Sequence, residues 1–220
     1  MPSLLLASAS PARRATLRAA GIEPHVLVSG VDEDAVLAGA RERFGALDPV
    51  DAVLLLANAK ADDVAARLED GETPSDHDGD LPEDLLVLGC DSLLDLDGEA
   101  LGKPRDADDA VARWRRMRGR SGLLHTGHWL VDLRPDSPPA TLGATSTTVV
   151  HFADVSDAEI AAYVATGEPL AVAGAFTVDG RGGAFVRGIE GDHHGVVGLS
   201  LPVLRDLLLQ VDLSVTDLWS

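Results

Sequence analysis

The chain is poor in cysteine, in aromatic residues and in long hydrophobic runs, and each shortage excludes something. Cys90 is the only cysteine among 220 residues, so no internal disulfide can form and a metal site built on thiolates has no ligand set. One cysteine fits a reducing compartment, and we expect a cytoplasmic location. Aromatic residues make up only 4% of the chain, so we expect a core of Leu, Val and Ala.

No apolar run approaches the roughly 20 residues that a helix needs to cross a bilayer. The short run Leu4-Leu5-Leu6 has no basic segment before it, which indicates a buried first strand rather than a signal segment. We therefore expect a soluble protein that binds no membrane.

Positive charge is scarce, because 36 acidic side chains outnumber 18 basic ones and the formal net charge is -18. Such an excess repels the phosphate backbone of nucleic acids, so we expect no nucleic-acid partner. Local clusters of Lys and Arg can still form a positive pocket for a small phosphorylated molecule. The position of such clusters therefore matters more than the total charge.

The apolar pattern predicts an α/β protein with a mixed sheet. We expect strands and helices to alternate irregularly along the chain, with strands at 4–6, 25–29, 85–88, 93–96, 123–133, 144–152 and 184–186. Helices are expected from Pro11 to Ala20 and at about 48–68, 107–117, 156–165 and 201–210. The acidic residues from Val31 onward are expected to form a loop.

Two polar segments interrupt this pattern. Residues 69–84 combine Pro, Gly and many carboxylates, a composition that favours a disordered surface insertion. A second, proline-rich loop is expected at about 134–141. Hydrophobic residues make up 45% of the chain, which is enough to form one core or two small lobes. We treat residues 1–220 as a single domain.

Polar residues follow the first predicted strand at the start of a helix. Ser8 and Ser10 supply hydroxyl groups there, and Arg13 and Arg14 supply guanidinium groups. Together with the backbone N–H groups of a helix start, they form a cradle for an anion. Taken alone, a simple N-cap followed by surface arginines is the more common explanation.

Asp91 lies between two apolar runs, in Gly89-Cys90-Asp91-Ser92. A carboxylate in such a place is costly to bury unless it is paired, binds a metal or acts on a substrate. Asp91 is therefore the first candidate for catalysis, and the alternative is a carboxylate bonded to backbone N–H groups at a strand end. Lys103, between Gly102 and Pro104, would otherwise be an ordinary turn lysine.

A glycine-rich segment covers residues 173–183, where small residues allow a ligand to approach the backbone closely. It lacks the strand-then-helix setting of a dinucleotide-binding loop. His193 and His194 follow Asp192, but adjacent residues of an extended segment point to opposite sides and do not share one metal ion.

Several of these motifs occur together and in order along the chain, at 6–14, 59–61, 89–92, 97–104, 163–170 and 189–199. In this arrangement the chain strongly resembles the Maf family of nucleoside triphosphate pyrophosphatases over roughly residues 4–209. Ordered motifs are far more specific than any one of them. The resemblance implies an elongated, two-lobed architecture with a central cleft, like that of inosine-triphosphate pyrophosphatases, and usually a homodimer.

The resemblance also implies that the protein hydrolyses a nucleoside triphosphate to the monophosphate and pyrophosphate, removing non-standard nucleotides with a divalent cation (Mg²⁺, Mn²⁺ or Co²⁺) as cofactor. By matching position, Asp91 would accept the proton of the attacking water, and Asp91 and Glu33 would hold the metal. The residues that would surround the triphosphate are Ser8, Ser10, Arg13, Arg14, Lys60 and Lys103.

The positions linked to base preference depart from the family pattern. The subgroup acting on dTTP and UTP has two arginines directly after the proline, a threonine after the catalytic aspartate and a glutamine in the glycine-rich turn. Here those places hold Ala12, Ser92 and Asp179. A subgroup acting on 7-methyl-GTP has Trp, Gln and Glu there, so only the acidic character of Asp179 agrees with it.

Two other functions remain open. The family has been linked with arrest of cell division, so a non-catalytic nucleotide-binding regulator is one alternative, and nucleotide binding without turnover would identify it. A house-cleaning pyrophosphatase of the inosine-triphosphate type is another, and a preference for ITP or XTP would reveal it.

We predict that Asp179→Gln shifts relative kcat/KM toward UTP or dTTP. A carboxylate only accepts hydrogen bonds, which favours a base with a donor edge such as guanine, whereas an amide both donates and accepts. Initial rates on a panel of nucleoside triphosphates measure the ratio, and an unchanged ratio across the panel would remove the idea.

Overall fold

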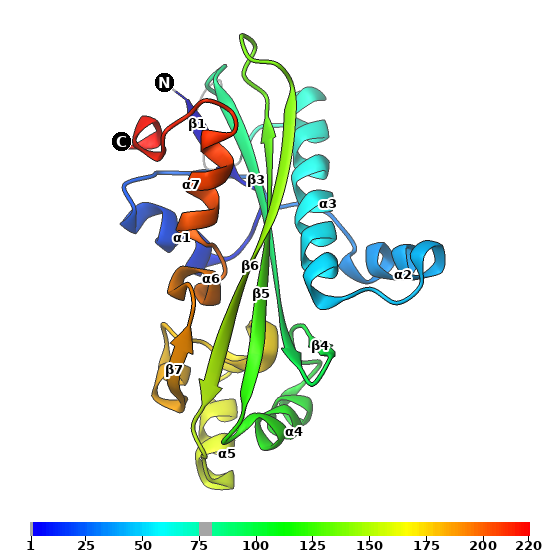
Figure 1. Cartoon of the computed structure of the whole chain (residues 1–220), viewed down its shortest axis with the longest axis vertical. Helices are drawn as coiled ribbons and strands as arrows, with labels where there is room; N and C mark the ends of the chain where they lie inside the picture. The colour runs from blue at the N-terminus through cyan, green and yellow to red at the C-terminus, as the bar shows by residue number, and fades with distance from the viewer. Residues whose placement is uncertain (1, 75–80) are drawn as a thin grey trace.

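The computed structural model describes residues 2–74 and 81–220, which form an elongated α/β molecule around a seven-stranded mixed sheet (Figure 1). The strand order is β2-β1-β3-β5-β6-β7, and β4 pairs with β3 beside this path. Pairs β1/β2 and β1/β3 are parallel and the others are antiparallel. The strands are β1 Ser3–Leu6, β2 His25–Val26, β3 Leu85–Leu96, β4 Glu99–Leu101, β5 Ser121–Asp132, β6 Ala140–Phe152 and β7 Val186–Glu190.

Helices cover both faces of the long β5–β6 hairpin, with α3 on one side and α1, α6 and α7 on the other, while α4 and α5 lie at one end (Figure 1). Their bounds are α1 Pro11–Ala19, α2 Glu33–Phe44, α3 Pro49–Glu69, α4 Ala107–Met117, α5 Asp157–Ala165, α6 His193–Val197 and α7 Leu201–Leu209. Short 3₁₀ helices are η1 Glu168–Ala171, η2 Ala173–Ala175, η3 Arg181–Phe185 and η4 Val215–Leu218. Within the described ranges, no helix is both long and apolar enough to span a membrane.

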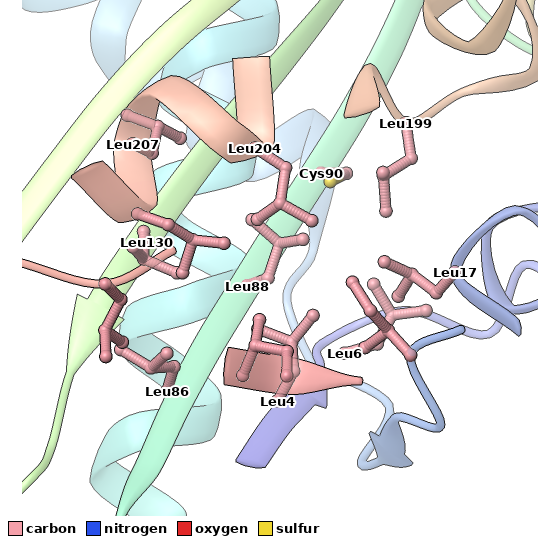
Figure 2. Packing of buried hydrophobic residues seen from close by; sticks show 14 of the residues in the cluster. Leu4, Leu6, Leu17, Leu86, Leu88, Cys90, Leu130, Leu199, Leu204 and Leu207 are labelled. Atoms are coloured by element: carbon pink, nitrogen blue, oxygen red, sulfur yellow. The ribbon is translucent and has the colours of Figure 1, made fainter. Parts of the chain in front are cut away.

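The alternation of side chains along β1 and β3 divides the core into two layers. Leu4 and Leu88 belong to one cluster with Leu204 of α7 (Figure 2), whereas Leu5 and Val87 pack in another cluster on the α3 side. Because both faces of β3 are covered, the strand is a nearly continuous apolar run. Continuing this alternation places Asp91 on the α3 side of the sheet and Ser92 on the α1 side.

A third cluster occupies the end of the sheet near α4 and α5, and it collects most of the chain's few aromatic side chains. Trp114 packs edge-to-face against Phe152, Tyr163 and Phe185, with ring centroids 5.7, 5.5 and 5.8 Å away. Phe176 meets Phe152 in the same way at 5.0 Å. The predicted Leu, Val and Ala core therefore describes one end of the molecule, and the other end relies on rings.

The expected α/β fold with a mixed sheet is confirmed, as are the helices near 48–68, 107–117, 156–165 and 201–210. Strands β5 and β6 each extend beyond their predicted ranges, with β6 starting at Ala140 inside the expected proline-rich loop. Residues 75–80 of the expected insertion lie outside the described residues. The two-lobed division and the single domain stay predictions.

Several local predictions were wrong. The runs at 85–88 and 93–96 form one continuous strand, because β5 pairs with β3 all the way from Leu86 to Asp95. The strand expected at 25–29 is only His25–Val26. At 184–186 a 3₁₀ helix leads into β7.

Two segments that were expected to be a loop and an extended stretch are in fact helix starts. The acidic residues after Val31 begin α2, because Asp32 caps that helix by accepting a hydrogen bond from the Ala35 N–H at 3.0 Å. His193 and His194 open α6 rather than an extended segment, with Asp192 as the N-cap.

Helix α3 lies directly against the backbone of β3 and β5 at two glycines. A Cβ added at Gly89 would be 2.1 Å from the Ala57 carbonyl oxygen, and one at Gly127 would be 2.4 Å from the Val53 carbonyl oxygen. Only glycine permits this approach, which sets the depth at which the next turn of α3 carries Lys60.

We predict that Gly89→Ala lowers the free energy of unfolding by about 1–3 kcal/mol or more, because the helix must move away from the sheet. Gly39→Ala is the matched control, because Gly39 lies inside α2 with open space around it, so alanine should be neutral or raise stability by up to about 1 kcal/mol. Urea unfolding measures both variants, and equal stability of the two would contradict the close packing.

Candidate active site

A cavity of about 480 Å³ opens where the loop between β1 and α1, the middle of β3, the loop after β4 and the start of the glycine-rich segment meet. It collects residues that are far apart in the sequence, from Ala7 to Gly198. Most of the residues predicted for the site line it, namely Ser8, Ser10, Arg13, Glu33, Lys60, Asp91, Ser92 and Lys103.

At the centre of the site, the Lys60 ammonium lies between two carboxylates. Its Nζ is 2.5 Å from Asp91 Oδ1 and 2.7 Å from Glu33 Oε1. Lys60 and Asp91 are both buried, with side chains 10% and 9% exposed, whereas Glu33 is 44% exposed. The three residues come from α3, β3 and the first position of α2, so this contact joins three elements.

The two carboxylates differ in their affinity for protons. Burial raises the pKa of Asp91 above its ordinary value, and the charges of Lys60 and Arg13 only partly oppose that effect. Burial also acts to raise the pKa of Glu33, but the hydrogen bond and charge of Lys60, helped by Lys103 and Arg13, lower it overall. Compared with an ordinary carboxyl group of its own type, Asp91 is therefore more readily protonated and Glu33 more readily ionised.

Arg13 holds the opposite wall of the cavity together. Its Nε donates to the Gly198 carbonyl at 2.7 Å, and its Nη1 donates to Ser8 Oγ at 3.0 Å and to the Cys90 carbonyl at 2.8 Å. Its Nη2 donates to Ser92 Oγ at 3.2 Å. One planar guanidinium group thus links the β1–α1 loop, β3 and the end of α6, which a lysine could not do.

A chain of hydroxyl groups continues from Arg13 into the sheet. Ser92 Oγ lies 2.9 Å from Thr126 Oγ1, and Thr126 donates to the Gly195 carbonyl at 2.8 Å. Because the Thr126 proton goes to Gly195, Ser92 is the donor to Thr126 and the acceptor from Arg13. Sequence reasoning missed Thr126, because only the β3–β5 register, which pairs it with Ser92, brings the two together.

Comparison with known proteins identifies the family. The family model described as "Maf-like protein" matches residues 3–211 of the chain. The chain belongs to the Maf-like family.

Relatives of this Maf-like protein carry the name "Nucleoside triphosphate pyrophosphatase". The relative from Salinispora tropica is 56% identical over 99% of this chain and 87% of its own length. The one from Streptomyces coelicolor is 52% identical over 99% and 94%. A crystal structure of a nucleoside-triphosphatase, a dITP/XTP pyrophosphatase from Mycobacterium abscessus, matches 96% of this chain and 94% of that chain, at 12% identity and a TM-score of 0.36.

Three residues predicted for the site do not line the cavity of this Maf-like protein. Arg14 turns toward Glu23, with Nη2 3.5 Å from Glu23 Oε1. Ala12 lies on α1, and Asp179 is exposed in the glycine-rich segment. Their proposed roles in substrate binding and base preference stay predictions.

The metal prediction rests on Glu33 and Asp91, which both contact Lys60. Among the residues that the structure describes, no group of three or more His, Cys, Asp and Glu side chains could hold a metal ion. Two carboxylates are nevertheless suitable ligands for Mg²⁺, since that ion is commonly held by one or two carboxylates together with substrate phosphates and water. The donor set therefore fits a cation that arrives with its substrate.

We predict that Arg13→Lys lowers kcat/KM of this Maf-like protein by about 10²-fold, because a misplacement of about 1 Å in a preorganised site costs that much. Lost hydrogen bonds to the Cys90 and Gly198 carbonyls should also lower the free energy of unfolding by about 1–3 kcal/mol. Steady-state kinetics and urea unfolding measure both effects.

Arg18→Lys is the matched control for this prediction. Arg18 also lies on α1, outside the cavity lining, and it pairs with Glu23 at 2.6 Å. Its replacement should change kcat/KM by no more than about twofold, because exposed ion pairs contribute little. Equal losses in the two variants would contradict the assignment of Arg13.

Proposed function

We propose that this Maf-like protein hydrolyses nucleoside triphosphates to nucleoside monophosphates and pyrophosphate. One observation carries the proposal. A buried carboxylate, Asp91, shares a cavity with Arg13, Lys60 and Lys103 in a chain with a net charge of -18. The names of relatives that are 48–56% identical over nearly the whole chain support the same activity.

The cations of the cavity account for binding of a triphosphate. Arg13, Lys60 and Lys103 approach it from α1, α3 and the loop after β4. The N-terminus of α1, where Ser10 Oγ accepts the Arg13 N–H, adds the partial positive charge of a helix start. Since acidic side chains outnumber basic ones by 36 to 18 in the whole chain, this cluster of cations favours binding of a polyanion in the cavity.

Asp91 accounts for the activation of water. Its Oδ1 is fixed by Lys60, and its raised pKa makes it a stronger proton acceptor than an exposed aspartate. General-base assistance of this kind typically contributes about 10²–10⁴-fold. The cations around the phosphates stabilise the charge that develops in the transition state, which is usually the larger contribution.

A divalent cation completes the proposal, with Glu33 and Asp91 as its protein ligands. When bound, Mg²⁺, Mn²⁺ or Co²⁺ would offset the negative charge of the phosphate oxygens. Lys60 already contacts both carboxylates, so its single positive charge offsets part of their negative charge in the free enzyme and favours the ionised form that a metal ligand needs.

Base preference, physiological role, assembly and location are finer parts of the proposal. Removal of non-standard nucleotides, a homodimer and a cytoplasmic location follow from the resemblance and the composition. For the base, Ser92 lines the cavity, but its hydroxyl is engaged with Arg13 and Thr126. Asp179 would have to reach the substrate from the exposed part of the glycine-rich segment.

We predict that Asp91→Asn lowers kcat by about 10²–10⁴-fold without loss of fold, because the amide cannot accept a proton from water. Asp95→Asn is the matched control. Asp95 lies on the same strand, outside the cavity lining, and accepts the Gly98 N–H at 2.6 Å, a bond that an amide oxygen preserves.

The assay incubates each protein with a panel of nucleoside triphosphates and Mg²⁺, Mn²⁺ or Co²⁺ and separates the products. Nucleoside monophosphate and pyrophosphate are expected in equal amounts. Orthophosphate and a diphosphate would contradict the proposed function, and binding without turnover under all three metals would support a non-catalytic regulator instead.

A further inference from the structure

Lys103 reaches the cavity from a loop without regular structure, which we call the Lys103 loop and define as residues 102–106, between β4 and α4. Neither strand nor helix hydrogen bonds fix the backbone of such a loop. A lysine side chain also has many rotamers, so its ammonium is poorly placed unless the loop itself is held. The structure shows what holds it.

An ion pair on helix α4 binds three backbone groups of the Lys103 loop. Arg113 donates from Nη1 to the Gly102 carbonyl at 2.6 Å and from Nη2 to the Lys103 carbonyl at 3.4 Å. Asp109 accepts the Arg105 N–H at 3.0 Å and pairs with Arg113 Nη2 at 2.8 Å. Two side chains one helical turn apart thus hold the loop on both sides of Lys103.

The pair is enclosed, unlike the other arginines of the same helix. The side chains of Arg113 and Asp109 are 12% and 15% exposed, whereas those of Arg115 and Asp157, which pair at 2.9 Å, are 53% and 56% exposed. Enclosing an ion pair costs desolvation energy unless further hydrogen bonds satisfy it. The loop carbonyls and the Arg105 N–H provide those bonds, and neither side chain lines the cavity.

The Gly102 carbonyl, which accepts a hydrogen bond from Arg113, also connects the Lys103 loop to another wall of the cavity. The Gly102 oxygen also accepts the Gly174 N–H at 3.1 Å, within the turn that contributes Ala173 to the lining. Trp114, next to Arg113, donates its indole N–H to the Ala175 carbonyl at 2.7 Å. Consecutive residues of α4 therefore hold both loops on this side of the cavity.

We propose that Arg113 is a positioning residue that fixes the backbone of Gly102 and Lys103 and so holds the Lys103 ammonium ready for the substrate phosphates. The inference rests on the proposed function of the cavity. Arg113 touches no substrate, and it acts only through Lys103. A preorganised cation needs no rearrangement when the polyanion binds, which is where such sites gain their effect.

A double-mutant cycle tests this coupling with Arg113→Met, Lys103→Met and the double variant. Two quantities are measured for each protein, kcat/KM for the preferred nucleoside triphosphate and the Kd of inorganic tripolyphosphate by calorimetry. Arg113→Met should lower kcat/KM and weaken tripolyphosphate binding, each by about 10-fold or more, in the native background. In the Lys103→Met background, Arg113→Met should change kcat/KM and the Kd by less than about twofold. The ammonium that Arg113 positions is then absent, so the two substitutions are not additive.

Two further variants separate positioning from stability. Arg113→Lys should give values of kcat/KM and Kd between those of Arg113→Met and the native protein. An ammonium can donate to one carbonyl, but it lacks the planar, two-pronged donor geometry of a guanidinium group. Arg115→Met removes an ion pair from the same helix without touching the loop, and it should leave both quantities within about twofold. If Arg113→Met does not fold, Asp109→Asn takes its place in the cycle. The amide oxygen can still accept the Arg105 N–H, but a neutral amide attracts the Arg113 guanidinium less strongly than a carboxylate does.

Equal losses from Arg113→Met in both backgrounds, or no loss in the native one, would overturn the proposal. The two measurements also separate it from the proposed function. A native protein without pyrophosphate-releasing turnover would refute the function, and the tripolyphosphate cycle would still decide whether Arg113 acts through Lys103.

Discussion

The contact between the Lys60 ammonium and the Asp91 carboxylate organises the candidate active site, because it joins α3 to the middle of β3. Both side chains are buried, so removing either one takes away the directly bonded partner of a charge that water can no longer solvate well. The same ammonium reaches Glu33 and thereby fixes the start of α2. The surroundings shift the pKa values of the two acids in opposite directions, raising that of Asp91 and lowering that of Glu33.

The scaffold supplies this contact by bringing α3 unusually close to the sheet. Gly89 removes the side chain that would keep the Ala57 turn away, and Lys60 follows within one turn. Strand alternation then gives β3 two working faces, with Asp91 facing Lys60 and Ser92 facing Arg13. The cavity is lined by residues from both faces, and it presents one base and several cations to the same ligand, which is an arrangement suited to hydrolysis of a polyphosphate.

Sequence reasoning located the parts of the site that violate ordinary patterning. Asp91 could be found because a carboxylate interrupts an apolar strand, whereas Lys60 is an ordinary helical lysine that only the resemblance singled out. Helix α2 was missed because its N-cap Asp32 and the acidic residues of its first turn resemble an acidic loop in the sequence. Thr126 and Arg113 could not be found, since their partners depend on strand register and on a loop path. Arg14 faces Glu23 while Arg13 faces the cavity, because adjacent helical residues point in different directions, and its part in substrate binding stays a prediction.

The most direct test of the account is the pKa of the Asp91 carboxyl group, followed by carbon-detected NMR during pH titration of the native protein and of Lys60→Met. We expect the native pKa to lie above that of a free aspartate, about 3.9, because burial outweighs the nearby cations. Removal of the Lys60 charge should raise it further. A native pKa at or below that of free aspartate, unchanged in Lys60→Met, would contradict the account.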